Sequence, residues 1–147
     1  MSTITVQIRS IRAEDAEAAA KLCGELGYPA DAGAVRRRVE EMAGSADHDV
    51  LVYCLNADVV GWIDIAIERH LQTEPAALIG GLVVAETVRS RGIGIQLCRA
   101  AEDWARARGL RRIRVRSNAT RERTHAFYLR DGYTRVKTSA VFEKALS

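Results

Sequence analysis

The sequence has little of what would place the protein in a membrane, outside the cell or around a metal ion. No apolar run approaches the ~20 residues of a membrane-spanning helix. The first ten residues also lack the basic-then-apolar order of a secretory signal. Only 3 cysteines occur in 147 residues, widely separated, and no CxxC motif or Cys/His pair suggests a metal site. We therefore expect a cytoplasmic protein with buried, reduced thiols and neither a disulfide nor a bound metal.

Two common phosphate-binding signatures are absent as well. No Gly-Lys-Ser/Thr occurs, which excludes a P-loop, and Leu97 stands where a dinucleotide fingerprint would need its third glycine. What is present is Arg89-Ser-Arg-Gly-Ile-Gly94, immediately before an amphipathic helical pattern. A helix start offers unpaired N–H groups and partial positive charge, and glycines let the backbone approach a ligand. With two arginines added, this stretch predicts a phosphate or pyrophosphate site, whereas the plainer alternative is a turn with solvated arginines.

Charge is distributed unevenly along the chain. The net charge is +3, but residues 1–88 carry 14 Asp and Glu against 7 Lys and Arg, whereas residues 89–137 carry 4 against 14. This asymmetry predicts an anionic partner for the second part and a cationic partner for the first.

The apolar periodicity predicts one mixed α/β domain over residues 1–147. Apolar residues make up 48% of the chain and charged residues 28%, as in soluble globular proteins. The expected order is β-α-α-β-β-β-α-β-α-β-β, which gives an α/β (α+β) domain with a sheet of about six to seven strands and about four helices. The last two expected strands are 133–138 and 140–146.

A second motif follows about thirty residues after the arginine–glycine stretch. It reads SNATRERTHAFYLRDGY, from Ser117 to Tyr133. The succession of a buried strand, RxxGxG, helix, strand, Asn and a helix with AFYLRDGY resembles the GNAT superfamily of acyl-CoA-dependent N-acetyltransferases. The resemblance covers most of the chain, and it implies a single GNAT-like domain with a mixed, mostly antiparallel sheet.

The resemblance also implies a set of residues that would bind acetyl-CoA. The strand ahead of the motif would pair its backbone with the pantetheine arm, and the motif would surround the pyrophosphate. Asn118 matches a position that touches the cofactor, and Tyr128 matches a tyrosine that lies near the thioester sulfur and protonates the departing thiolate. The residues expected at the strand and the motif are Leu82, Val83, Val84, Arg89, Ser90, Arg91, Gly92, Ile93, Gly94 and Ile95.

The general base is left open by the sequence. Several members of the superfamily place a glutamate on the strand before the motif, but AALIGGLVV, residues 76–84, has no ionisable side chain. Asp64 and Glu68 on the preceding strand are the catalytic candidates that remain. They share a face but lie ~13 Å apart by strand rise, so both cannot serve one proton. His70, His125 and a chain of waters are further alternatives.

The function implied is transfer of the acetyl group of acetyl-CoA to a primary amine of a small cationic molecule, by direct attack through a tetrahedral intermediate. The acidic part of the chain, with Tyr28 and Asp31 in a turn, would hold the acceptor. The alternatives are acetylation of a protein lysine or N-terminus, and a non-catalytic acyl-CoA-binding module. Nucleic-acid binding through residues 106–116 ranks last, because their arginines alternate along a strand without an aromatic platform. No membrane partner is expected, and the resemblance allows a homodimer.

Overall fold

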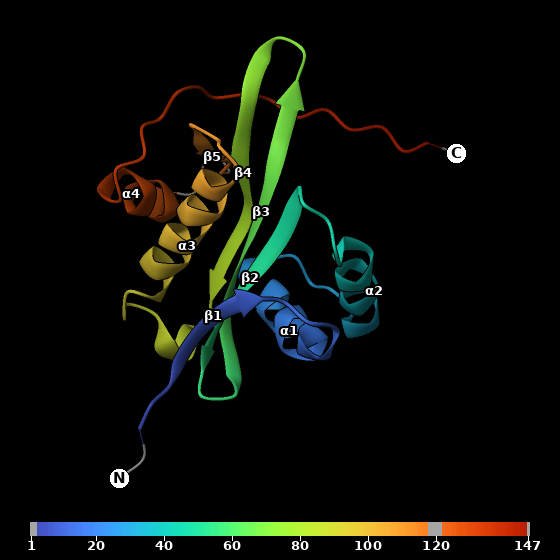
Figure 1. Cartoon of the computed structure of the whole chain (residues 1–147), viewed down its shortest axis with the longest axis vertical. Coiled ribbons are helices and arrows are strands. Elements are labelled where there is room, and N and C mark those ends of the chain that lie inside the picture. The colour runs from blue at the N-terminus through green and yellow to red at the C-terminus, as the bar shows by residue number, and fades with distance from the viewer. Residues whose placement is uncertain (1–2, 118–121, 147) are drawn as a thin grey trace. The chain divides into compact units, whose positions relative to one another are not determined.

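A sheet of five strands organises the larger of two units in this protein (Figure 1). The computed structural model describes residues 3–117 and 122–146. These residues divide into a first unit, Met1–Arg116, and a second unit, Ser117–Ser147. The prediction of a single domain over residues 1–147 stays a prediction.

The strand order in the sheet follows the order in the chain. The first four strands pair antiparallel, and the fifth pairs parallel to the fourth. Val, Ile and Leu predominate in the central strands because the sheet is covered on both faces there. In chain order the strands are β1 (Val6–Ser10), β2 (His48–Leu55), β3 (Asp58–His70), β4 (Thr73–Val84) and β5 (Ile113–Val115).

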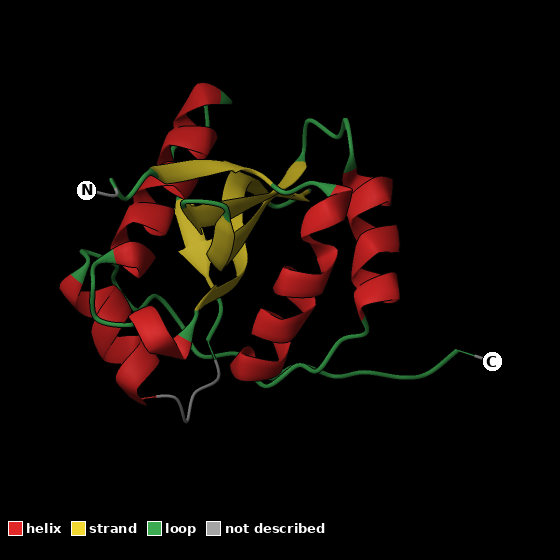
Figure 2. Cartoon of the chain, turned by 90° about the horizontal axis from the view of Figure 1, so that it is seen from below, coloured by secondary structure: helices red, strands yellow, loops and turns green. Residues whose placement is uncertain are grey.

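Helices cover both faces of this sheet, as Figures 1 and 2 show. Helices α1 (Ala16–Leu26) and α2 (Ala32–Met42) lie on one face, and α3 (Ile93–Ala107) lies on the other. The short 3-10 turns η1 (Ala13–Asp15) and η2 (Glu86–Val88) precede α1 and follow β4. None of the described helices is both long and apolar enough to cross a membrane.

Local signals set the boundaries of the first two helices as the sequence predicts. Gly27, with φ 99°, ends α1 in the left-handed region that glycine occupies without strain. The Asp31 side chain accepts a hydrogen bond from the N–H of Ala34 at 3.1 Å and so caps the start of α2.

Each face of the sheet has its own core. On the first face, small side chains of α1 pack with Val35 and Val39 of α2, and Trp62 of β3 packs against them. On the second face, α3 contacts β2, β3 and β4. Ile63, Ile65, Ile79, Leu97 and Cys98 are fully buried on this second face, whereas the fully buried Val52 stands opposite Trp62 on the first face.

The second unit contains helix α4 (Glu122–Arg130), after which Gly132 has φ 89°. The Tyr128 ring packs edge-on against Phe127 and Tyr133, with ring centroids 5.1 and 5.4 Å apart. The N–H of Tyr133 donates to the carbonyl of Tyr128 at 2.9 Å and closes the turn that follows the helix.

The two strands expected at 133–138 and 140–146 are not formed, so the prediction of six to seven strands is corrected to five among the described residues. Their apolar side chains are exposed, with Val141 at 87% and Phe142 at 92%. Alternating apolar residues stabilise a strand only where a ladder partner and a covered face are present. The described part of the second unit contains no sheet that could supply them.

Candidate active site

Strands β4 and β5 pair over only a short length, and this leaves one edge of β4 open. The ladder runs from Ala77 opposite Ile113 to Ile79 opposite Val115. Among the described residues, no strand pairs with that edge of β4 beyond Ile79. The stretch from Gly80 to Val84, which contains the predicted Leu82, Val83 and Val84, therefore offers backbone donors and acceptors to an extended ligand.

A bulge interrupts β4 where this open edge begins. Asp64 of β3 pairs with Gly81 and Ile65 pairs with Ile79, so Gly80 has no partner on β3. An extra residue of this kind bends its strand and redirects neighbouring side chains. The bulge therefore lies between the paired and unpaired parts of β4.

The arginine–glycine stretch forms the loop that enters α3. Ser90 has φ 67° and Gly92 has φ 78°, and α3 begins at Ile93 with no side-chain cap. The N–H of Gln96 donates to the Gly92 carbonyl at 3.1 Å. The three N–H groups ahead of it, those of Ile93, Gly94 and Ile95, lie at the positive end of the helix, where an anion is favoured.

Arg89 joins this loop to the open strand. Its Nε donates to the carbonyl of Val84, the last residue of β4, at 3.2 Å. The start of α3 is thus tied to the end of the unpaired stretch. An anion at the helix start and an extended chain along β4 would therefore be contiguous.

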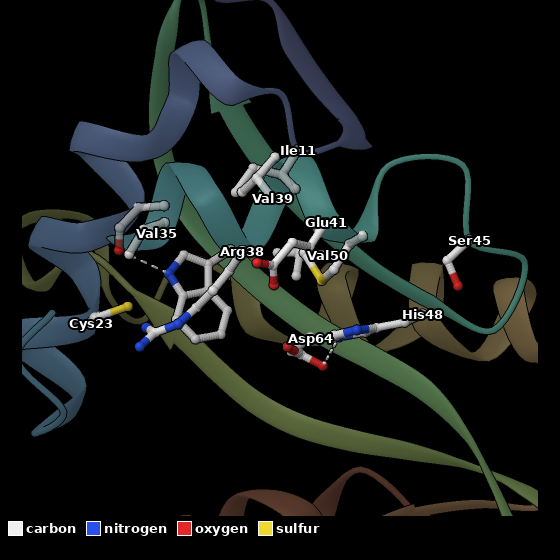
Figure 3. Close-up of a pocket in the computed structure, with 13 residues that line it drawn as sticks. Ile11, Cys23, Val35, Arg38, Val39, Glu41, Ser45, His48, Val50 and Asp64 are labelled. Carbon is white, nitrogen blue, oxygen red and sulfur yellow. Dashed lines mark hydrogen bonds and ion pairs between the residues drawn. The ribbon is translucent and has the colours of Figure 1, made fainter. Parts of the chain in front are cut away.

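A pocket of about 500 Å³ lies on the sheet face that carries α1 and α2 (Figure 3). Its wall is mostly apolar, with Trp62 and Met42 among the larger side chains, and its charged members are Arg38 and Glu41 of α2 and Asp64 of β3. The residues that line it are Ile11, Ala19, Cys23, Val35, Arg38, Val39, Glu41, Met42, Ser45, His48, Val50, Trp62 and Asp64. Tyr28 and Asp31, predicted on the acceptor side, are not among them; Tyr28 is 66% exposed and Asp31 caps α2.

Asp64 is paired with His48 at this pocket. The Asp64 Oδ1 and His48 Nε2 atoms are 2.9 Å apart, and the Asp64 side chain is only 31% exposed. Burial raises the pKa of Asp64, while His48 opposes the rise through its charge and its hydrogen bond. The carboxyl group is therefore a stronger proton acceptor than an ordinary surface aspartate.

The glycine pair of β4 makes room for two side chains of β3. A Cβ at Gly80 would lie 3.2 Å from Asp64 Oδ1, and a Cβ at Gly81 would lie 3.1 Å from the Trp62 ring. Both distances are shorter than ordinary van der Waals contact. The two glycines therefore explain how an aspartate and a tryptophan lie flat against the bulge.

Glu68 has a different environment, although it stands on the same strand. Its Oε1 lies 2.6 Å from His70 Nε2 and 2.9 Å from Arg116 Nη2. The hydrogen bond with His70 and the charge of Arg116 lower the pKa of Glu68. Glu68 does not line the pocket. The structure therefore places only one of the two candidate carboxylates beside the bulge and the pocket.

Apart from Glu68, the predicted site residues of the first unit fall into one continuous path. It runs from the start of α3 through Arg89 to the open edge of β4 and to Asp64 at the bulge. Tyr128 lies in α4 of the second unit and Asn118 lies outside the described residues, so their roles stay predictions. The described residues contain no cluster of three or more His, Cys, Asp or Glu side chains able to hold a metal ion.

Sequence reasoning did not identify His48. Its position depends on strand register: Val50 of β2 stands opposite Asp64, and His48 is two residues further along. Diagonal neighbours on paired strands reach each other with long side chains. Without the register, nothing in the sequence joins residues 48 and 64.

Sequence comparison identifies relatives of this chain. The acetyltransferase (GNAT) family matches residues 11–133. An aminoalkylphosphonate N-acetyltransferase from Salmonella typhimurium is 38% identical over 79 residues, which are 53% of this chain and 51% of the relative. An aminoglycoside N(6')-acetyltransferase type 1 from Klebsiella aerogenes is 27% identical over 94 residues, 62% of each chain. The matched stretch thus spans about half to three fifths of these relatives.

Solved structures give the same assignment for the fold. The aminoglycoside N-acetyltransferase AAC(6')-Iy, in complex with CoA, has a TM-score of 0.87 at 17% identity, covering 99% of this chain and 98% of that chain. AAC(6')-Ih from Acinetobacter baumannii has a TM-score of 0.83 at 18% identity, covering 97% and 100%. The predicted resemblance and fold class are confirmed, and the chain belongs to the acetyltransferase (GNAT) family.

Proposed function

We propose that this chain is an acetyl-CoA-dependent N-acetyltransferase that acetylates a primary amine of a small molecule. One observation carries the proposal: the uncapped start of α3 is joined by Arg89 to the unpaired edge of β4. A phosphate-binding end and an extended backbone edge suit the two ends of a CoA molecule. Membership of the family supports the assignment. The names of both curated relatives describe acetylation of an amine nitrogen.

The donor would lie along this path. The N–H groups at the start of α3, with Arg91 nearby, would bind the pyrophosphate, because a helix start and guanidinium groups both favour an anion. The pantetheine arm would pair with the open edge that includes Leu82 to Val84. The acetyl group would then lie near the bulge at Gly80.

The acceptor would occupy the pocket beneath α1 and α2. Its carboxylates, Glu41 and Asp64, suit a cationic amine, and its apolar wall suits a molecule with a hydrocarbon portion. Arg38 adds a positive group to the same wall. The pocket therefore fits a small amine that carries apolar surface. An acidic substituent on that amine could form an ion pair with Arg38.

The reaction is direct transfer. The neutral amine nitrogen attacks the thioester carbon, and a backbone N–H of Leu82 to Val84 would stabilise the oxyanion of the tetrahedral intermediate. The C–S bond then breaks as the amide forms. Tyr128 would protonate the thiolate, because a phenol hydroxyl is a competent proton donor to a thiolate.

Thermal shift and thiol release test the proposal together. Acetyl-CoA and CoA should raise the melting temperature, because a ligand of the native state stabilises it. Thiol release should follow with at least one of 1-aminoethylphosphonate, neamine and phenylethylamine. The proposal would be refuted if acetyl-CoA and CoA gave no shift and no amine gave thiol release. A shift without thiol release would indicate an acyl-CoA-binding module. Thiol release with a lysine peptide alone would indicate a protein substrate.

Two pairs of variants test the individual roles. Arg91→Ala should raise the KM for acetyl-CoA by about tenfold through loss of a charge-assisted contact, whereas Arg36→Ala, at an exposed pair with Glu40 on α2, should not.

Tyr128→Phe should lower kcat by about 100-fold if the hydroxyl is the acid, with Tyr133→Phe as the matched control. Full activity in Tyr128→Phe would remove that tyrosine from the mechanism.

A further inference from the structure

A carboxylate borders both the acceptor pocket and the bulge of β4, although β4 itself offers no ionisable side chain from Ala76 to Val84. We propose that Asp64 accepts the proton of the bound amine and that His48 positions the carboxylate for this step. This inference rests on the proposed function. It assigns to a β3 residue a task that the predicted resemblance would place on the next strand.

The bulge brings the carboxylate to the open edge of β4. Gly80 is the residue without a β3 partner, and the unpaired stretch of β4 begins there. Asp64 Oδ1 and Cγ would lie 3.2 and 3.5 Å from a Cβ at this position. A Cβ there would be closer to the carboxylate than an ordinary van der Waals contact, so the carboxylate lies directly beside the backbone along which the thioester would bind.

His48 fixes one oxygen and leaves the other available. Its Nε2 bonds Oδ1, as the dashed line in Figure 3 shows. Asp64 Oδ2 has no hydrogen bond to the described residues, and the Asp64 side chain lines the pocket. The pair therefore presents an oriented oxygen to an amine in the pocket. His48 is a positioning residue, and Asp64 is the catalytic one.

The surroundings favour proton acceptance by Asp64. The charged groups that act on it are His48 and Asp49 of β2. Arg38 and Glu41 of α2 and the Cys23 thiol of α1 line the same pocket, and the stretch of β4 from Ala76 to Val84 has no ionisable side chain. Burial is the strongest influence on Asp64 and raises its pKa, and Asp49 adds to the rise. A carboxylate whose pKa is raised towards neutral pH accepts a proton from a bound amine more readily than a solvated carboxylate does.

Protons and bonds balance in this scheme. The bound ammonium gives one proton to Asp64 Oδ2, and the neutral nitrogen forms the C–N bond to the thioester carbon. The nitrogen loses its second proton as the intermediate collapses and the C–S bond breaks. The CoA thiolate takes up one proton and Asp64 returns the other to water, so each turnover releases one proton.

The dependence of kcat/KM on pH tests the assignment, with neamine and 1-aminoethylphosphonate as amine probes. Asp64→Asn should lower kcat/KM by at least about 100-fold and abolish the acid limb that Asp64 causes. His48→Ala should move this limb to higher pH, because the two interactions that lower the pKa of Asp64 are lost. His48→Gln retains an N–H donor and should restore part of the rate. Asp103→Asn, at an exposed aspartate of α3, is the matched control.

A titration of the Asp64 carboxyl carbon by NMR provides a readout that needs no substrate. His48→Ala should raise the pKa measured there in the direction of the kinetic shift. An active Asp64→Asn with an unchanged acid limb, or an Asp64 titration unaffected by His48→Ala, would overturn this inference alone. Absence of thiol release from the wild-type protein with every amine would overturn the proposed function and this inference with it.

Discussion

Asp64 and Glu68 stand four positions apart on β3, and their environments are opposite. Asp64 is half-buried against Gly80 at the pocket, where burial raises its pKa. Glu68 has His70 and Arg116 as ion partners, and these lower its pKa. The chemistry of the two carboxylates is nearly identical, so their neighbours alone account for the opposite directions of the two pKa shifts, and we expect only Asp64 to act as a proton acceptor.

Activity should separate the two carboxylates most strongly. Asp64→Asn should reduce kcat/KM by about 100-fold or more, because the amide cannot accept a proton, and Glu68→Gln should reduce it by less than about tenfold. Thiol release at pH 7.5 with one amine measures both. Equal losses of kcat/KM in the two variants would show that the different environments of Asp64 and Glu68 do not determine which carboxylate serves catalysis.

The substitution Gly80→Ala should lower kcat by displacing the Asp64 carboxylate, while Asp64 itself is retained. A Cβ there would displace the Asp64 carboxylate by a few tenths of an ångström, and a misplacement of this size should cost about tenfold in kcat. The same substitution at Gly24 of α1 meets no atom within 4 Å and is the matched control. Gly80→Ala with wild-type kinetics would show that the close contact is unimportant.

Stability should change in opposite directions at the two sites. Asp64→Asn removes a half-buried charge and should raise the melting temperature at pH 7.5, whereas Glu68→Gln breaks two ion pairs and should lower it. Each effect should be about 2–4 °C, as expected for changes near 1 kcal/mol in a chain of this length. Calorimetry of both variants measures the signs, and equal signs would contradict the contrast in pKa.

The pH dependence of stability should differ in the same way. Glu68, with a lowered pKa, stabilises the fold above its unfolded pKa of about 4.3, and this contribution is lost as the pH falls through the folded value. Asp64, with a raised pKa, favours the fold only at low pH and loses that contribution as the pH rises through its folded value. The melting-temperature differences of both variants should therefore shrink towards pH 3.

The smallest expected effect belongs to Arg116. Its Nη2 lies 2.9 Å from Glu68 Oε1, but its own side chain is 61% exposed. Exposed pairs contribute about 0–1 kcal/mol, so Arg116→Ala should lower the melting temperature by about 3 °C or less. Denaturation at 1 M salt should give the same difference or a smaller one, and a larger loss would mean that the pair is less exposed to solvent than its geometry indicates.

Much of the architecture could be predicted from local sequence signals. The glycine after α1, the aspartate before α2 and the alternation in β3 each act over a few residues, and each was found where expected. The strands expected at 133–138 and 140–146 were wrong, because alternation does not tell whether a ladder partner and a covered face exist.

The candidate site divides in the same way. The sequence predicted the loop from Arg89 to Gly94 as a binding site because its motif is contiguous, and it named Asp64 only as one of several candidate bases. His48 was missed, since its contact depends on the register between β2 and β3. The meaning of Gly80 also depended on register, because it packs against a side chain of another strand.

The uncapped start of α3 has a consequence for the folded protein without ligand. Gly92 stands at the N-cap and supplies no side chain, and the described residues show no side-chain hydrogen bond that caps this turn. An anion bound there, as we propose for the pyrophosphate of CoA, would take the place that a serine or aspartate side chain holds at the start of other helices. The concentration of that anion would then determine how often the first turn of α3 frays, even in the absence of any reaction.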